Sequence, residues 1–238
     1  MGDGIQWLAD LEHWMSSVVF ARGISAKGLA LRMGGAPDGA SEPITDAEVW
    51  DLGIEEYRPG ADGDGVVRVG ECAGWSFAVE YGDSTGSDRL TEISRNGVET
   101  FHYVPMQEHP PATVNYARDG VLTWGLGLKE ETHRWGREPD LLLPDLIAAQ
   151  VLGPDGATPG AAEGEHYTTA YRRTLGVIEK RFSLSLSPAY LNEARLPAYA
   201  VRGNPAMHTG PDPDFDVIHA WATAKWASPA PTCTTARP

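Results

Sequence analysis

The chain of 238 residues carries a formal net charge of −14, and 42% of its residues are apolar, with eight tryptophans among them. A disordered chain has few aromatic residues, so this composition predicts a folded globular protein. The excess of carboxylates repels nucleic-acid phosphates and anionic lipid, which argues against DNA, RNA or a membrane surface as the main ligand.

The negative charge is concentrated in the first half of the chain. Residues 1–120 hold 8 Lys and Arg against 20 Asp and Glu, a net charge of −12, whereas residues 121–238 hold 11 against 13, a net charge of −2. An acidic half suits a basic protein partner or a cationic small molecule. Acidity that serves only solubility is the more common explanation of such a charge.

The cysteines and the N-terminus indicate a protein of the cytoplasm. Cys72 and Cys233 lie in unlike surroundings without a CxxC motif, so no disulfide framework is expected. The N-terminus lacks a basic region followed by an apolar run, and no stretch of about 18 apolar residues occurs. We therefore expect a cytoplasmic protein without a membrane segment.

Four elements are expected in the first 53 residues. The apolar spacing and end signals predict a helix over Ile5–Met15, a strand over Ser16–Ala21, a helix over Ser25–Met33 and a helix over Thr45–Gly53. The last of these begins with a capping box, in which the side chains of Thr45 and Glu48 each accept the backbone N–H of the other residue.

The clearest period-2 pattern runs over Val66–Tyr81 and predicts a hairpin. In its second strand Trp75, Phe77, Val79 and Tyr81 share one side, and Ser76, Ala78 and Glu80 share the other. This alternation is typical of a strand with one buried face. We expect the Trp75 side to pack against the helix at Tyr167–Phe182.

The remaining elements complete an α+β fold. The pattern predicts a helix within 82–97 that starts near Ser87, a strand over 98–104, a hairpin over 113–128 that turns at Asp119-Gly120, and helices over 143–152, 165–182 and 187–191. We expect a mostly antiparallel sheet of about five or six strands packed against helices, in a single domain over 1–200. Residues 201–238 form a tail rich in Pro, Gly and Asp.

No motif in the chain forces a chemistry. Phosphate-binding glycine spacings, GxSxG and HExxH are all absent, so neither a catalytic residue nor a cofactor is assigned. Glu80 is a candidate general base or ligand contact, although a paired or solvent-facing Glu is more common. His102 and His133 are interpreted first as structural or surface residues.

The segment before the helix at 143–152 is a candidate binding loop. Trp135 could stack on a ligand while Arg134 and Arg137 hold its carboxylate. In the alternative interpretation Trp135 plugs the end of the core, and Arg137 pairs with Glu138 or Asp140.

Two segments contain metal-ligand residue types. The acidic loop 55–65 lacks the EF-hand spacing and is interpreted as a solvated loop. In the tail, His208 and His219 flank Asp212, Asp214 and Asp216, a set that suits a divalent cation. A polar surface segment is the more common explanation of such a pattern, so no metal is assigned.

Four short motifs carry a family resemblance. The segments GISAKGLALRMGG (23–35), GWSFAVE (74–80), YARDG (116–120) and WGREPDLLLPDL (135–146) resemble, in this order, an uncharacterised actinobacterial, Streptomyces-type family of unknown function. The resemblance covers residues 5–195. It implies an actinobacterial origin but no catalytic residues.

Two functions follow as hypotheses. The first is a non-catalytic binding protein, similar to immunity proteins or small regulators, that presents an acidic surface to a protein or peptide. Its candidate contact residues are Trp75, Glu80, Arg134, Trp135 and Arg137.

The second hypothesis is an enzyme of an actinobacterial specialised-metabolite pathway. Its pocket would be lined by Trp75, Trp124 or Trp135, and Glu80, His102 or His133 would act as acid and base. Neither hypothesis specifies the oligomeric state.

Overall fold

The computed structural model describes residues 4–10, 16–51, 65–82, 84–105, 111–160 and 164–203. By its internal contacts the chain divides into Met1–Asn204 and Pro205–Pro238. The second unit lies outside the described residues. So do the metal hypothesis for the tail and all but the last residue of the acidic loop at 55–65.

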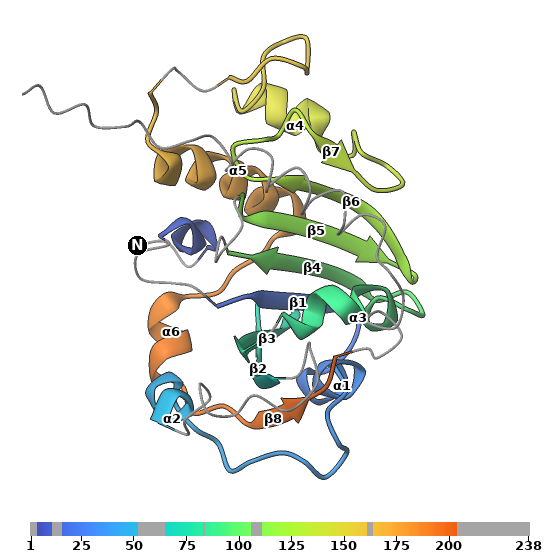
Figure 1. Cartoon of the computed structure of the whole chain (residues 1–238), viewed down its shortest axis with the longest axis vertical. Helices are drawn as coiled ribbons and strands as arrows, with labels where there is room; N and C mark the ends of the chain where they lie inside the picture. Colours follow the sequence, from blue (N-terminus) through green and yellow to red (C-terminus); the bar gives the residue numbers. More distant parts are fainter. Residues whose placement is uncertain are drawn as a thin grey trace, which may run out of the picture. The chain divides into compact units, whose positions relative to one another are not determined.

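One antiparallel sheet of eight strands organises the first unit (Figure 1). The strands are β1 (Val18–Arg22), β2 (Gly65–Cys72), β3 (Trp75–Gly82), β4 (Glu99–Val104), β5 (Thr113–Arg118), β6 (Val121–Gly127), β7 (Arg134–Trp135) and β8 (Ala198–Val201). Their order across the sheet is β7-β6-β5-β4-β1-β3-β2-β8. The α+β class and the antiparallel sheet are therefore confirmed, whereas the expected five or six strands were too few.

The two strands that the sequence does not predict lie at the edges of the sheet. β7 has only two residues, and β8 has four within a Pro- and Gly-rich stretch, so neither gives a measurable period-2 pattern. β8 pairs with β2 from Gly65↔Val201 to Arg68↔Ala198.

A crossover places a helix over the middle of the sheet. β4, β5, β6 and β7 form a meander, but β1 lies between β3 and β4 and is antiparallel to both. β3 and β4 are thus parallel to each other, and the chain joins them through α3 (Thr85–Ile93).

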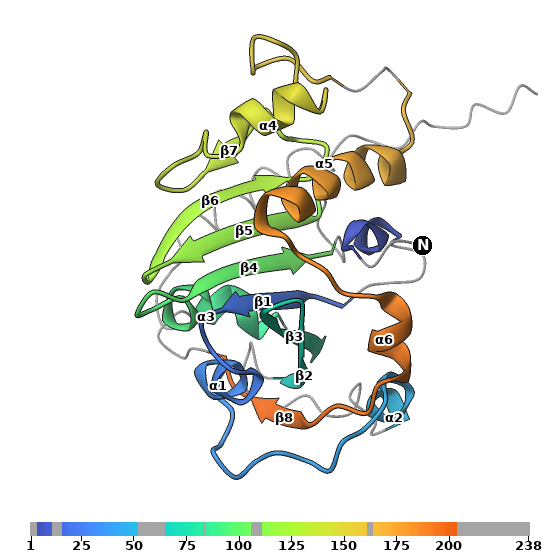
Figure 2. The same cartoon turned by 180° about the vertical axis from the view of Figure 1, so that it is seen from behind.

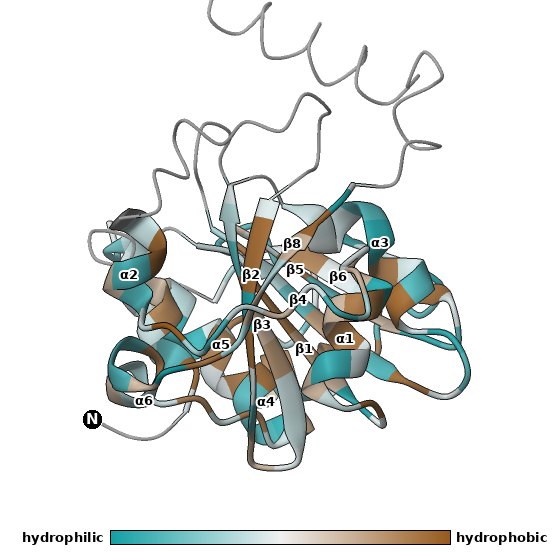
Figure 3. Ribbon diagram, turned by 90° about the horizontal axis from the view of Figure 1, so that it is seen from below, coloured by the Kyte–Doolittle hydropathy of each residue, from teal (hydrophilic) through white to brown (hydrophobic). Residues whose placement is uncertain are grey.

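Helices cover both faces of the sheet (Figures 2 and 3). Besides α3, the elements are η1 (Gln6–Ala9), α1 (Ala26–Arg32), α2 (Asp46–Asp51), α4 (Leu143–Ala148), α5 (Tyr167–Phe182) and α6 (Pro188–Glu193). We call the two sides of the sheet the Trp75 face and the Glu80 face. Residues of η1, α2, α4, α5 and α6 pack into the core of the Trp75 face, while α1 and α3 pack on the Glu80 face.

The larger core lies on the Trp75 face, as the aromatic alternation predicts. Trp75, Phe77 and Trp124 are buried there with Leu175 and Ile178 of α5. The Trp75 indole Nε1 donates a hydrogen bond of 3.3 Å to the carbonyl of Phe182. The predicted contact between this face and the helix at Tyr167–Phe182 is confirmed.

The prediction that β3 has only one buried face was wrong. Ser76, Ala78 and Glu80 are buried as well, because α1 and α3 cover them. Their small or polar side chains hide this second contact in the sequence, since a buried strand face is expected to be apolar.

The predicted end signals largely act as expected. The Ser25 hydroxyl accepts the Gly28 N–H at the start of α1. The Thr45 hydroxyl accepts the Glu48 N–H, and the Glu48 carboxylate accepts the Thr45 N–H, so the capping box is confirmed. Asp119 and Gly120 both have positive φ, which fits the two-residue turn between β5 and β6.

Several helix boundaries differ from their predictions, and α4 ends at Ala148, four residues before the predicted Leu152. The N-terminal helix is a short 3-10 turn over Gln6–Ala9, and residues 11–15 lie outside the described part of the chain. α3 starts at Thr85, two residues before the predicted Ser87, with Ser84 in the N-cap position.

Candidate functional site

Glu80 and His102 meet on the Glu80 face of the sheet. They come from β3 and β4, and β1 lies between these strands. Glu80 Oε2 is 2.9 Å from His102 Nε2, and the two side chains are only 2% and 0% exposed. Two of the acid–base candidates from the sequence therefore form one buried pair.

The start of α3 covers this pair. The Gly86 N–H donates a hydrogen bond of 2.6 Å to Glu80 Oε1, so both carboxylate oxygens have a partner. A Cβ at position 86 would lie 2.5 Å from Val19 Cγ2 and 3.1 Å from both Glu80 Oε2 and His102 Nε2. Only a glycine allows the helix to approach so closely.

Three serines lie beside the pair. Ser84 Oγ is 3.4 Å from His102 Nε2, 3.3 Å from Ser17 Oγ and 3.2 Å from Ser87 Oγ. Ser17 is buried, Ser84 is half-buried and Ser87 is exposed. The hydroxyls thus lead from the buried imidazole to the surface.

The arrangement does not match a nucleophilic Ser–His–Glu triad. In such a triad the acid binds one imidazole nitrogen and the serine binds the other. Here Glu80 and Ser84 both lie on Nε2, while His102 Nδ1 is buried and has no hydrogen-bond partner among the residues that the structure describes. The geometry instead suits a hydrogen-bonded pair that fixes the start of α3 on the sheet.

Trp135 lies farther along the same face. Its indole Nε1 donates a hydrogen bond of 2.8 Å to Asn115 Oδ1, and Asn115 is the register partner of His102. Trp135 pairs in register with Gly125, where a Cβ would collide with the indole. Trp135 is half-buried and is separated from Glu80 by several strands.

The two arginines beside Trp135 differ in their roles. Arg134 holds Asp140 Oδ1 at 2.9 Å and the Glu131 carbonyl at 2.7 Å. The alternative pairing of Arg137 with Glu138 or Asp140 was wrong, because Arg134 takes Asp140 and Arg137 is exposed. The three residues of this segment therefore do not converge on a common point.

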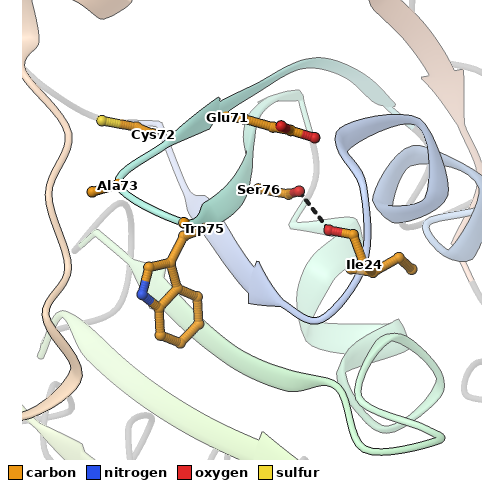
Figure 4. A pocket seen from close by; sticks show the side chains of 7 residues that line it. Ile24, Glu71, Cys72, Ala73, Trp75 and Ser76 are labelled. Carbon is orange, nitrogen blue, oxygen red and sulfur yellow. Dashed lines mark hydrogen bonds between the residues drawn. The ribbon is translucent and has the colours of Figure 1, made fainter.

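Trp75 lies at the hairpin end of the Trp75 face, beside an open hollow (Figure 4). The Arg22 guanidinium lies 4.7 Å from the centre of its ring. Nearby Glu71 accepts the Ala26 N–H, and Ser76 donates to the Ile24 carbonyl. These bonds fix the start of α1. Trp75 and Glu80 lie on opposite faces of β3.

A buried arginine network is the feature that the sequence interpretation missed. Arg68 in β2 is fully buried, and its guanidinium donates to Asp46 Oδ1, the Tyr81 hydroxyl and the carbonyls of Leu191 and Ala194. Arg68 alternates with Val67 and Val69 and so lies on the opposite face of β2, where its register partner is Val79. A charged residue opposite two valines is expected to face solvent, so the local sequence pattern does not reveal its burial.

Tyr81 belongs to the same network. Its hydroxyl donates to Asp46 Oδ1. Burial, and then the hydrogen bond to Asp46, raise the pKa of Tyr81 well above its usual value. The Tyr81 phenol therefore keeps its proton and lies between the Asp46 carboxylate and the Arg68 guanidinium.

The residues that the structure describes offer neither a metal cluster nor a membrane-spanning helix. Within them, no three His, Cys, Asp or Glu side chains gather as a metal site. None of the helices that the structure describes is long and apolar enough to cross a membrane. Comparison of the chain with models of protein families, with curated proteins and with solved structures gave no significant match.

Proposed function

We propose that this protein is a non-catalytic binding protein that presents an acidic surface to a basic protein or peptide. The observation that carries the proposal is a set of surface carboxylates that have no cation partner. Within the described ranges eight exposed carboxylates make no ion pair, namely Asp38, Glu42, Glu71, Glu130, Glu138, Asp145, Asp155 and Glu193. Their field attracts a cationic partner and speeds its association at low ionic strength.

The internal bonding of the candidate residues also supports binding over catalysis. The imidazole of His102 and the carboxylate of Glu80 bind each other, and the Trp135 indole binds Asn115. Groups bound in this way stiffen the scaffold, and a stiff scaffold lowers the entropy that is lost when a partner binds.

The proposal is tested with a labelled Lys- and Arg-rich peptide. We expect saturable binding in fluorescence anisotropy that weakens as NaCl rises from about 0.02 to 0.15 M, because exposed charges are screened over this range. A Gly- and Ser-rich peptide of equal length is the control. Equal binding of the two peptides, or no binding at low salt, would contradict the proposal.

The enzyme hypothesis is favoured by one observation, the convergence of Glu80 and His102 at 2.9 Å. Glu80→Gln separates the two functions, because it removes the carboxylate but keeps the shape of the side chain. A binding protein should keep its peptide affinity within about twofold, since Glu80 is buried away from the surface. An acid–base role in catalysis instead predicts loss of turnover in the same variant.

The family resemblance of residues 5–195 and the actinobacterial origin that it implies remain predictions. They agree with a role similar to that of immunity proteins or small regulators.

A further inference from the structure

Two exposed aromatic side chains lie on neighbouring helices. Among the residues that the structure describes, the exposed large hydrophobic side chains are Trp50 at 49%, Tyr190 at 41% and Val121 at 38%. Trp50 belongs to α2 and Tyr190 to α6, and these helices contact each other at one edge of the molecule's first unit (Figures 1 and 2). Exposed aromatic residues that lie together are typical of binding surfaces.

Both rings are held firmly by the core beneath them. The Trp50 ring packs edge-on against Tyr81 at 5.5 Å between centroids, and Tyr190 packs in the same way against Phe77 at 6.2 Å. Each side chain therefore has one side fixed and the other open to solvent. Such rings lose little side-chain entropy when a partner covers them.

The Arg68 network fixes the two helices beside each other. Its guanidinium reaches Asp46 at the start of α2 and the carbonyls of Leu191 in α6 and Ala194 just after it. A fully buried guanidinium is costly unless all its partners are in place. Because Arg68 belongs to β2 and binds both helices, it holds α2 and α6 at a fixed distance from each other once the sheet has formed.

Two carboxylates lie on the same helices as the aromatic rings. Glu48 lies on α2, where its partner Arg195 is 2.9 Å away, and Glu193 ends α6 as an exposed carboxylate without an ion pair. Aromatic faces attract Lys and Arg through cation–π interactions, and nearby carboxylates add charge attraction. The combination fits a cationic side chain better than an anionic or purely apolar one.

We propose that the surface formed by α2 and α6 is the docking site for the basic partner, with one Lys or Arg side chain placed over Trp50 and another over Tyr190. This inference rests on the proposed function and adds its location and its contact chemistry. We call the surface formed by Trp50, Tyr190, Glu48 and Glu193 the α2–α6 surface.

The test compares variants of this surface with a variant elsewhere, using the same labelled Lys- and Arg-rich peptide. Trp50→Ala and Tyr190→Ala should each weaken binding about five- to tenfold, because each removes a cation–π contact and its packing. Val121→Ala, which changes an exposed apolar residue outside the surface, should leave the affinity within about twofold.

A charge reversal keeps the test valid if an aromatic truncation disturbs the fold. Glu193→Lys changes an exposed side chain without internal contacts, and it should weaken binding and lower its salt dependence. Wild-type affinity in all three surface variants would overturn the proposed docking site on α2 and α6 but leave the proposed function intact. A wild-type protein that binds no cationic peptide would instead overturn the proposed function and, with it, this inference.

Discussion

At the scale of single residues, the absence of a side chain at position 86 sets the distance between α3 and the sheet. The Gly86 N–H reaches Glu80 only because no Cβ keeps the helix away. A Cβ at position 86 would meet the Val19 side chain first. Val19 is β-branched and lies in a central strand, so it has little freedom to move. The fit of the buried Glu80–His102 pair thus depends on a residue outside it.

We expect Gly86→Ala to destabilise the protein by about 1–3 kcal/mol, as overpacked cores do. Gly176→Ala, in the middle of α5, is the matched control, because a Cβ there would meet only the Gln6 side chain at 3.4 Å. It should raise stability by up to about 1 kcal/mol through helix propensity. Urea unfolding measures both, and a Gly86→Ala variant as stable as wild type would show that α3 does not pack this tightly.

Sequence reasoning found part of the candidate site at this scale. Glu80 and His102 were named as candidates, but their meeting depends on β1 lying between β3 and β4, and no local pattern encodes that strand order. The sequence does not reveal that Trp50 is exposed, because large apolar side chains are usually buried to a high degree.

At the scale of elements, strong local signals determined what could be predicted. The hairpins at 66–81 and 113–128 and the helix at 167–182 follow from long periodic patterns and turn residues. β7 and β8 are short edge strands whose pairing is set by β6 and β2, so tertiary contacts rather than their own residues specify them.

Arg68 is the residue through which β2 holds α2 and α6. Arg68→Met should cost about 3–5 kcal/mol, because it leaves Asp46, the Tyr81 hydroxyl and two carbonyls without this donor. Arg118→Met is the control, since its contact with Glu99 is exposed and 3.9 Å long, and it should cost less than about 1 kcal/mol. Similar unfolding free energies for the two variants would show that the arginine network does not hold the helices.

At the scale of the whole molecule, burial of tyrosines couples stability to alkaline pH. Burial is the main cause that raises the pKa of Tyr81, Tyr103, Tyr116 and Tyr171. Below the unfolded value of about 10, both states keep the phenol protons, and the stability is fully present. Above it, the unfolded chain releases protons that the folded chain retains, so the folded state loses stability.

We therefore expect the urea midpoint to stay level up to about pH 10 and to fall above it. Tyr103→Phe should reduce this fall, because it removes one of the buried phenols, although it also removes the hydrogen bond to the Leu8 carbonyl. A midpoint that is unchanged well above pH 10 would contradict the burial of these rings.

The central claim is that an acidic, aromatic surface on α2 and α6 binds a basic partner. Its most direct test is a titration of ¹⁵N-labelled protein with the Lys- and Arg-rich peptide at low salt, followed by backbone amide shifts. We expect the largest shifts at residues 46–51 and 188–195 and at the Trp50 indole N–H. Shifts that gather on other elements, or that spread evenly over all exposed carboxylates, would contradict it.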